Sequence, residues 1–241
     1  MNLKNWARAV LPTLALTSCG GGGGSGTAPG SGAAYQFVQP TPNSTLTYSD
    51  TIVDNANNTI NAGFTETVLA VDPDGGFVIL NQPANPTLIV NGTNYGGPPQ
   101  TQTFNGSGQG TTVVYTDGVP FTCAYTPHGF GPDYPVRVGQ IWTLDYTYGC
   151  NSAEPTAFSQ TGTVVDVESV TVPAGTYSAI KLQSTLTWTD ANGTVITQTV
   201  SNWRDVASSI SVKQDISIAY GGTPPTNGHA VSRTIMLLST S

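Results

Sequence analysis

Charge is scarce in this chain, and basic charge is the scarcest. Only 9% of the 241 residues are Asp, Glu, Lys or Arg, and seven basic residues stand against 14 acidic ones. Nucleic-acid-binding proteins neutralise phosphates with clustered Lys and Arg, and docking on anionic lipid needs a polybasic patch. Neither pattern occurs, so the sequence excludes nucleic acid as a partner and electrostatic binding to a membrane surface.

Long apolar runs and helical periodicity are missing too. The apolar run at residues 9–16 is far shorter than the roughly 20 residues of a membrane-spanning helix. No window of 12 or more residues repeats apolar side chains at the i, i+3, i+4, i+7 spacing of an amphipathic helix. We therefore predict little or no helix after residue 18.

Catalytic signatures are also absent. The chain has no Gly-x-Ser-x-Gly elbow, phosphate-binding loop, dinucleotide fingerprint or zinc spacing. Its two histidines, His128 and His229, are predicted to be surface loop residues. A His128–Asp133 metal or acid–base pair is an alternative interpretation, and so is a hydrolase that uses His128 or carboxylates. We expect no enzyme activity, no metal and no cofactor.

Two pairs of acidic residues are spaced closely enough to suggest a calcium site or a catalytic pair of carboxylates. Asp72 and Asp74 lack the remaining ligands of a calcium loop, so a turn is the better interpretation. Asp166 and Glu168 are two residues apart on a predicted strand and should share one face. Without a cleft nearby, a solvated face is favoured over a glycosidase pair of carboxylates.

The N-terminus carries the most specific signal in the chain. Lys4 and Arg8 precede the short apolar run, and the segment ends in Leu-Thr-Ser-Cys with the cysteine at Cys19. This order is typical of a secretory signal, and its ending resembles the lipobox of bacterial lipoproteins. That resemblance implies cleavage after residue 18, a lipid on Cys19 and attachment to a membrane. An ordinary signal peptide with a chance cysteine is the alternative.

The mature protein would consist of a tether and one domain. Residues 19–34 are rich in Gly, Ser, Thr and Pro and are predicted to be a flexible tether. Loss of Lys4 and Arg8 leaves five basic residues against 14 acidic ones, a net charge near −9. Gly20 follows the modified cysteine, where Asp would signal inner-membrane retention, so we expect lipid anchoring in the outer membrane, facing the periplasm or the cell surface.

The two remaining cysteines, Cys123 and Cys150, are predicted to form a disulfide in an oxidising cell envelope. Closing a loop of this length stabilises a fold by about 3–4 kcal/mol in the chain-entropy model. Two free buried thiols are the alternative, and a metal site is disfavoured because no second thiol pair exists.

Residues 35–241 have the pattern of an all-β domain. About a dozen runs of Thr, Val, Ile and aromatic residues alternate with Gly-, Pro- and Asn-rich breaks. Short connections indicate antiparallel neighbours, and this many strands should curl into a half-barrel, barrel or sandwich. The predicted strands are 45–53, 60–71, 77–80, 88–90, 111–116, 121–125, 137–148, 160–172, 177–189, 195–203, 210–218 and 231–238. Asn192-Gly193 predicts a hairpin with a type I′ turn.

One motif recurs at a spacing of 100 residues. Pro73, Gly75 and Phe77 are followed by Pro173, Gly175 and Tyr177. Two similar hairpin units in one domain are one interpretation. Chance recurrence of the same turn chemistry is the other.

Residues 136–215 contain the motif Val-Pro-Ala-Gly-Thr-Tyr at 172–177, then a strand with Trp203, then Val212-Lys213. This order resembles the DUF3108-like domain of bacterial envelope proteins. The resemblance implies a curved antiparallel sheet in an exported protein with no established chemistry. By fold analogy, such sheets are similar to the half-barrels of lipoprotein carriers, which hold acyl chains against a concave apolar face.

The tryptophans are the large apolar side chains of the second half. Trp188 and Trp203 should share a face if their strands adjoin, and with Trp142 they either pack in the core or line a pocket or a glycan-binding face. The sequence thus predicts a non-catalytic, lipid-anchored envelope protein that binds a hydrophobic small molecule. A protein-interaction or structural surface module, with another envelope protein as partner, is the alternative.

Overall fold

The computed structural model describes residues 32–116, 118–151, 153–222 and 228–241. The predicted signal segment, Cys19 and most of the predicted tether lie outside these residues. The described residues contain no helix, so none is long and apolar enough to cross a membrane.

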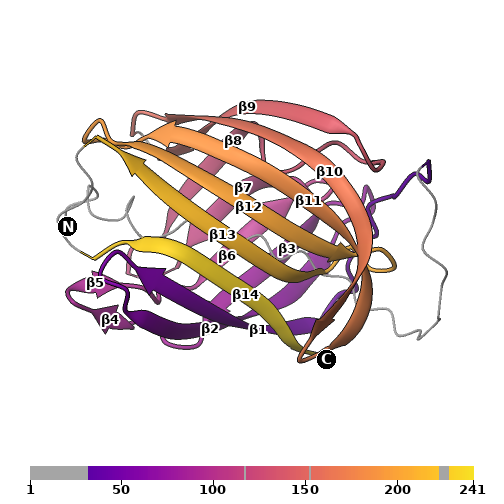
Figure 1. The fold of residues 1–241 in the computed structure, drawn as a ribbon, viewed down its shortest axis with the longest axis horizontal. Helices are drawn as coiled ribbons and strands as arrows, with labels where there is room; N and C mark the ends of the chain where they lie inside the picture. The colour runs from indigo at the N-terminus through magenta and orange to yellow at the C-terminus, as the bar shows by residue number, and fades with distance from the viewer. Residues whose placement is uncertain (1–31, 117, 152, 223–227) are drawn as a thin grey trace.

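Twelve antiparallel strands form one closed barrel, and two short strands form a separate hairpin (Figure 1). Each barrel strand pairs with the next in the chain, except that β3 pairs with β6 across the β4–β5 hairpin, and β1 pairs with β14 to close the ring. The all-β prediction is confirmed, and of its three architectures the barrel is the observed one. The strands are β1 (Thr45–Asp54), β2 (Thr59–Val71), β3 (Phe77–Pro83), β4 (Ile89–Val90), β5 (Thr93–Asn94), β6 (Gln100–Phe104), β7 (Gly110–Tyr115), β8 (Phe121–Gly129), β9 (Ile141–Cys150), β10 (Thr156–Val172), β11 (Gly175–Thr189), β12 (Val195–Asp205), β13 (Ser211–Gly221) and β14 (Ala230–Thr240).

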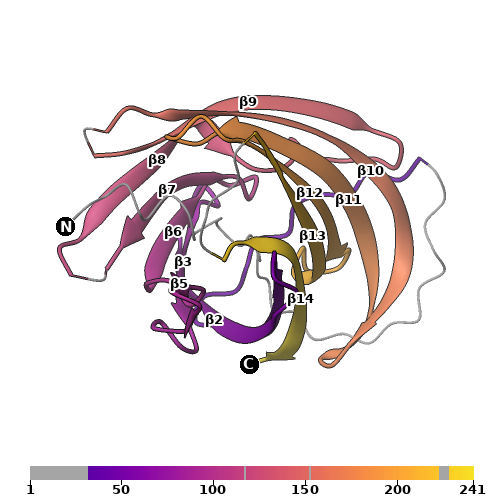
Figure 2. The ribbon, with the colours of Figure 1, turned by 60° about the vertical axis from the view of Figure 1, so that its left-hand side comes forward.

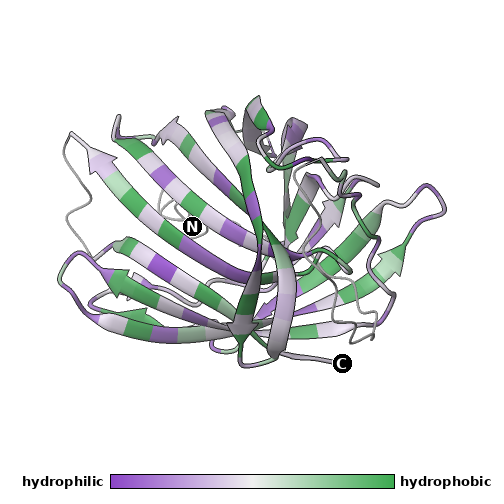
Figure 3. Cartoon of the chain, turned by 45° about the vertical axis from the view of Figure 1, so that its right-hand side comes forward, coloured by the Kyte–Doolittle hydropathy of each residue, from purple (hydrophilic) through white to green (hydrophobic). Residues whose placement is uncertain are grey.

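Alternation of side chains along each strand separates the lumen from the outer surface. On β1 every second residue, from Leu46 to Asp54, is buried, and the residues between them are mostly Thr and Ser at intermediate exposure. Figure 3 shows the resulting bands of hydrophobic and hydrophilic residues along the strands. The outer face of this strand therefore carries Thr and Ser in place of charged residues. Thr is a residue that extended backbone favours.

The two ends of the barrel differ. We call the end that carries the β4–β5 hairpin the mouth, and the opposite end the closed end (Figure 1). At the closed end the segment before β1 crosses from one side of the ring to the other. Tyr35 exchanges backbone hydrogen bonds with Val136, and the Val38 amide donates to Ser209 Oγ at 3.0 Å. Because Val136 and Ser209 lie on connections far apart around the ring, the segment closes this end.

The long β10–β11 hairpin also bends over the closed end. Its tip reaches β14, where the Ala174 amide donates to the Leu237 carbonyl at 3.2 Å. Val172 packs there in an apolar cluster with Leu46 and Leu237, all of them buried. Figure 2 shows β10 and β11 wrapping around one side of the lumen, with β2 on the other. The lumen is therefore accessible chiefly from the mouth.

The predicted hairpin at Asn192-Gly193 is confirmed, but the predicted type I′ turn is wrong. A type I′ turn needs positive φ at both central residues, whereas only Gly193 has it, at 79°. Asp190 Oδ1 accepts hydrogen bonds from the amides of Asn192 and Thr194 at 2.8 and 2.9 Å. The aspartate thus holds a wider turn in which glycine alone takes the left-handed conformation.

Two strand predictions also need correction. Gln100–Phe104, which was predicted to lie between strands, forms β6, and residues 137–140, predicted as strand, form a turn closed by the Gln140 amide on the Arg137 carbonyl. β6 is Gln-Thr-Gln-Thr-Phe, so its alternation is between two polar residue types. The apolar pattern that identifies a strand is absent there.

The motif that recurs at 100 residues lies at equivalent places in the barrel. Both copies form the turn of a hairpin at the closed end, β2–β3 and β10–β11. The first strand of each hairpin carries a register shift, between Val68 and Ala70 in β2 and between Val164 and Asp166 in β10. The two hairpins therefore share a turn motif and a bulge.

Candidate functional site in the barrel lumen

The lumen is lined by amide side chains as well as apolar ones. Amides donate and accept hydrogen bonds, so they equip an otherwise apolar interior to hold polar groups. These buried side chains come from β3, β6, β10, β12 and β13 and are Asn81, Gln100, Gln102, Gln160, Gln198, Asn202 and Gln214.

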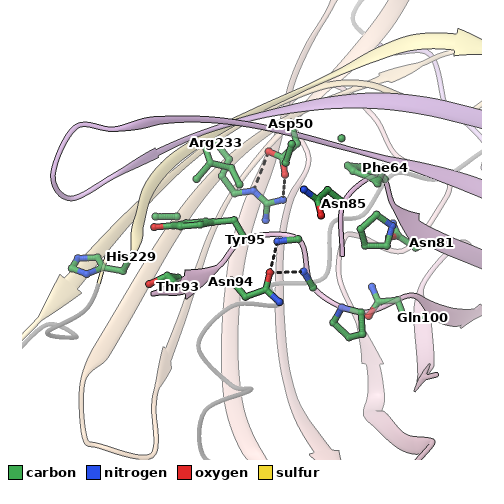
Figure 4. A pocket seen from close by; sticks show the side chains of 18 of the residues that line it. Asp50, Phe64, Asn81, Asn85, Thr93, Asn94, Tyr95, Gln100, His229 and Arg233 are labelled. Atoms are coloured by element: carbon green, nitrogen blue, oxygen red, sulfur yellow. Dashed lines mark hydrogen bonds and ion pairs between the residues drawn. The ribbon is translucent and has the colours of Figure 1, made fainter. Parts of the chain in front are cut away.

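A pocket of about 100 Å³ opens at the mouth (Figure 4). Its walls are formed by strands β1, β2, β3, β13 and β14, the start of β6 and the segment around β5. Tyr95 and His229 contribute aromatic rings, and Asp50 and Arg233 contribute the charges. The pocket therefore combines a flat apolar surface with a charged one.

Asp50 and Arg233 form a buried ion pair across the seam that closes the barrel. Asp50 lies on β1 and Arg233 on β14, and their side chains are 4% and 12% exposed. The Arg233 guanidinium donates through Nε to Asp50 Oδ1 at 3.3 Å and through Nη2 to Oδ2 (Figure 4). Such a two-pronged arrangement fixes geometry as well as charge.

The segment around β5 is held against the mouth by local hydrogen bonds. Asn94 Oδ1 accepts from the amides of Gly96 and Gly97 at 2.9 and 3.4 Å (Figure 4), and Thr93 Oγ1 donates to the Gly228 carbonyl at 2.6 Å. At Gly96 a Cβ would lie 1.9 Å from the Asn85 carbonyl oxygen. Only glycine fits there, so this side of the pocket has a defined shape.

Tyr220, on the aromatic side of the mouth pocket, is uncharged at neutral pH. Burial raises the pKa of Tyr220 to about 12, and its hydroxyl donates to the Ala230 carbonyl at 3.0 Å. The His229 ring meets the Tyr220 ring edge to face, with centroids 4.3 Å apart. Hydrogen bonds from Asn58 lower the pKa of nearby Asp54, and His229 adds to that effect.

A second cavity of about 70 Å³ lies further inside the lumen. Arg233 lines both cavities, so its side chain stands between them. Leu182, Leu186 and Ile216 give the inner cavity apolar walls, and amide side chains and Arg204 give it polar ones. The two cavities together form an amphipathic path from the mouth into the barrel.

The structure does not bring together the residues of the histidine sites that were considered from the sequence. His128 lies near the end of β8 at the closed end, partly exposed in a strand and not in a loop as predicted, whereas His229 precedes β14 at the mouth. Asp133 accepts a hydrogen bond from Gln109 Nε2 at 2.7 Å. In the described part of the chain, no three His, Cys, Asp or Glu side chains are grouped as metal ligands.

The acid pairs have structural roles. Asp72 and Asp74 belong to the β2–β3 turn, where the Gly76 amide donates to Asp74 Oδ1 at 3.2 Å. Asp166 and Glu168 are both exposed on β10, and Asp166 Oδ1 accepts from the Val167 amide at 2.7 Å. Neither pair lines a cavity described above.

Cys123 and Cys150 form the predicted disulfide. The two residues lie directly opposite each other on β8 and β9, so the bond joins neighbouring strands.

The predicted shared face of Trp188 and Trp203 is wrong. Their strands adjoin, but Trp188 pairs with Ile196 and Trp203 with Lys181, which places the two rings on opposite faces. Trp188 packs near Phe158 inside the barrel, with centroids 5.4 Å apart. Trp203 lies outside, and Trp142 lines the inner cavity.

Trp203 is nevertheless almost buried, at 8% exposure. The ammonium groups of Lys181 and Lys213 each lie 4.7 Å from its ring centroid, and its indole donates to Glu168 Oε1. These contacts stabilise the outer face through cation–π attraction.

Sequence reasoning missed the charged and amide groups of the lumen. Asp50, Arg204 and Arg233 are three of only 21 charged residues in the chain, and all three are nearly buried. A charged residue at an apolar position of a strand pattern was the signal available. Asp50, between Tyr48 and Ile52, shows it clearly.

The fold and lumen define this protein as an all-β barrel with internal cavities of mixed polar and apolar lining. No protein-family model matches the chain, and no curated protein matches it either. The DUF3108-like resemblance therefore stays a prediction.

Three solved structures are similar to the chain. An exported protein of Bacteroides fragilis, described as having a YmcC-like fold, has a TM-score of 0.47 at 13% identity and covers 87% of this chain and 100% of its own. A lipoprotein of Parabacteroides distasonis has a TM-score of 0.48 at 11% identity, with 86% and 99% covered. The hypothetical lipoprotein YmcC of Escherichia coli has a TM-score of 0.42 at 12% identity, with 83% and 85% covered. These similarities assign no function.

Proposed function

We propose that this chain is a lipid-anchored, non-catalytic protein of the bacterial cell envelope whose barrel holds a small ligand in its lumen. The lipobox-like ending at Cys19 supports the anchor, and Gly20 supports the outer membrane as its location. The opposite placement of His128 and His229 supports a role without catalysis.

The pair of cavities that meet at Arg233 carries this proposal. Their volumes are about 100 and 70 Å³, whereas pockets for drug-sized ligands measure roughly 300–1,000 Å³ and a cavity of about 150 Å³ holds benzene. These sizes favour a small molecule over a long acyl chain. The mixed lining favours a ligand with both an apolar and a polar part, so the hydrophobic ligand expected from sequence is here a small amphipathic one.

Native mass spectrometry of the full-length protein, purified in mild detergent from its own membranes, tests the proposal. We expect wild-type protein to carry an additional small mass. Ala62→Trp should abolish that mass, because Ala62 lines the mouth pocket and an indole would fill it. The matched control is Ala219→Trp, since Ala219 is exposed on β13 between two pocket-lining residues, and it should retain the ligand.

A bare mass for wild-type protein would contradict the lumen ligand and favour a second candidate, a protein-interaction module. The observation that favours this candidate is the exposure of large apolar side chains at the mouth. Ile89, Val119 and Val195 are 63%, 86% and 44% exposed, and each lies at or beside a connection at that end. Such side chains would mark a surface that a partner covers if they formed one contiguous apolar patch.

A further inference from the structure

Asn81 and Gln100 place two amide groups side by side in the mouth pocket. They lie directly opposite each other on β3 and β6, and both line the pocket. Side chains in such a pair have Cβ atoms about 5 Å apart on one face of the sheet. The Asn81 amide is held in place because its Nδ2 donates to Glu66 Oε1 at 3.2 Å.

Each of these amides has one end that solvent still reaches. Gln100 Oε1 is covered by protein, so Nε2 is the end that the pocket exposes. Within the described residues, Gln100 Nε2 and Asn81 Oδ1 form no hydrogen bond, and neither atom is buried from solvent. The pocket therefore presents a hydrogen-bond donor next to an acceptor.

Arg233 supplies a second donor from another wall of the pocket. Its Nε and Nη2 bind Asp50, which compensates its charge. Nη1 is not buried and makes no hydrogen bond in the part of the chain that the structure describes. Figure 4 shows Asp50 and Arg233 on one side of the pocket and Asn81 and Gln100 on another. Donors and an acceptor around a compensated charge favour an uncharged ligand with several hydroxyls, because a hydroxyl both donates and accepts.

Tyr95 gives the pocket an apolar surface. Its hydroxyl is buried although the residue as a whole is partly exposed, so the part of its side chain that faces the pocket is ring carbon. Such a ring packs well against apolar C–H groups. The pocket volume of about 100 Å³ is smaller than the roughly 150 Å³ that encloses benzene. A six-membered ring would therefore enter in part and leave its other edge at the mouth.

We propose that the mouth pocket binds one pyranose ring of a neutral sugar. Sugar hydroxyls would bond to Asn81 Oδ1, Gln100 Nε2 and Arg233 Nη1. The apolar C–H face of the ring would lie against Tyr95. This inference rests on the proposed lumen ligand and names its chemical class.

Saturation-transfer NMR tests this inference on the full-length protein, in a detergent whose headgroup is not a sugar. Glucose, galactose, mannose and N-acetylglucosamine are titrated separately. Cyclohexanol provides a six-membered ring with a single hydroxyl, and glucuronate provides a charged analogue of glucose. We expect at least one neutral sugar to bind saturably and about tenfold or more tightly than cyclohexanol, because it forms several hydrogen bonds. Glucuronate should bind no more tightly than glucose, since Asp50 already compensates Arg233.

Two matched variants locate the binding. Gln100→Leu removes the exposed amide and should weaken binding of the preferred sugar about fivefold, as the loss of a hydrogen bond does. Gln102→Leu makes the same change at a buried side chain of the same strand that lines neither cavity, and it should leave the affinity within about twofold. The comparison of affinities in wild-type protein needs no variant to fold.

Four results would overturn the inference: binding of no sugar, equal binding of cyclohexanol and the sugars, tighter binding of glucuronate than of glucose, or equal losses in the two variants. If native spectra then still show a bound mass that is not a sugar, the proposed function survives. A bare native mass together with no sugar binding overturns both.

Discussion

The Asp50–Arg233 pair shows how strongly the stability of a protein with few charges can depend on one buried ion pair. Removing one partner of a buried ion pair leaves the other uncompensated, which costs about 3–5 kcal/mol. We therefore expect Asp50→Ala to lower the free energy of unfolding by about that amount, measured by urea denaturation. The double change Asp50→Leu/Arg233→Met should recover most of the loss, because no lone charge remains.

An exposed ion pair provides the comparison. Lys213 Nζ and Asp215 Oδ2 are 2.7 Å apart on the outer face, with side chains 29% and 41% exposed. Asp215→Ala should cost less than about 1 kcal/mol, since solvent screens the pair. Equal losses from Asp50→Ala and Asp215→Ala would show that burial at the seam adds nothing to the Asp50–Arg233 interaction.

At the scale of elements, the disulfide links two strands that already pair. Cys123 and Cys150 are 27 residues apart in sequence, so replacing both with Ala should lower the free energy of unfolding by about 3–4 kcal/mol through the unfolded chain. The far-ultraviolet circular dichroism should remain that of a β protein, because the β8–β9 ladder does not depend on the bond. An unchanged urea midpoint would contradict this expectation.

The elements that sequence predicted well are those with an apolar face. β1, β2 and β10–β14 were all predicted within a few residues of their observed bounds, because Val, Ile and aromatic residues recur at every second position. β6 was missed because its inward residues are Gln100 and Gln102. For the same reason the lumen site was not predicted: its groups are polar, and polarity on a strand normally indicates the outer face.

At the scale of the whole molecule, the proposed lipid anchor is the feature on which the proposed location depends. We expect Cys19→Ala to abolish acylation and to release the protein from membranes, because the apolar run before it is too short to hold the chain by itself. Cell fractionation and intact mass measure the two effects. The Cys123→Ala/Cys150→Ala protein is the control, and it should remain with the membrane. Membrane retention of the Cys19→Ala protein would contradict the anchor.

The β1–β14 seam makes closure of the barrel depend on the last strand that the structure describes. Asp50 lies opposite Ile235 in that ladder, so the first and last barrel strands are neighbours. In the proposed export, N-terminus first, β1 would stay unpaired on one side until β14 had crossed the inner membrane. A prematurely ended chain would expose two open strand edges, which are templates for aggregation and accessible to proteases. Closure of the barrel thus fails in any chain that lacks β14.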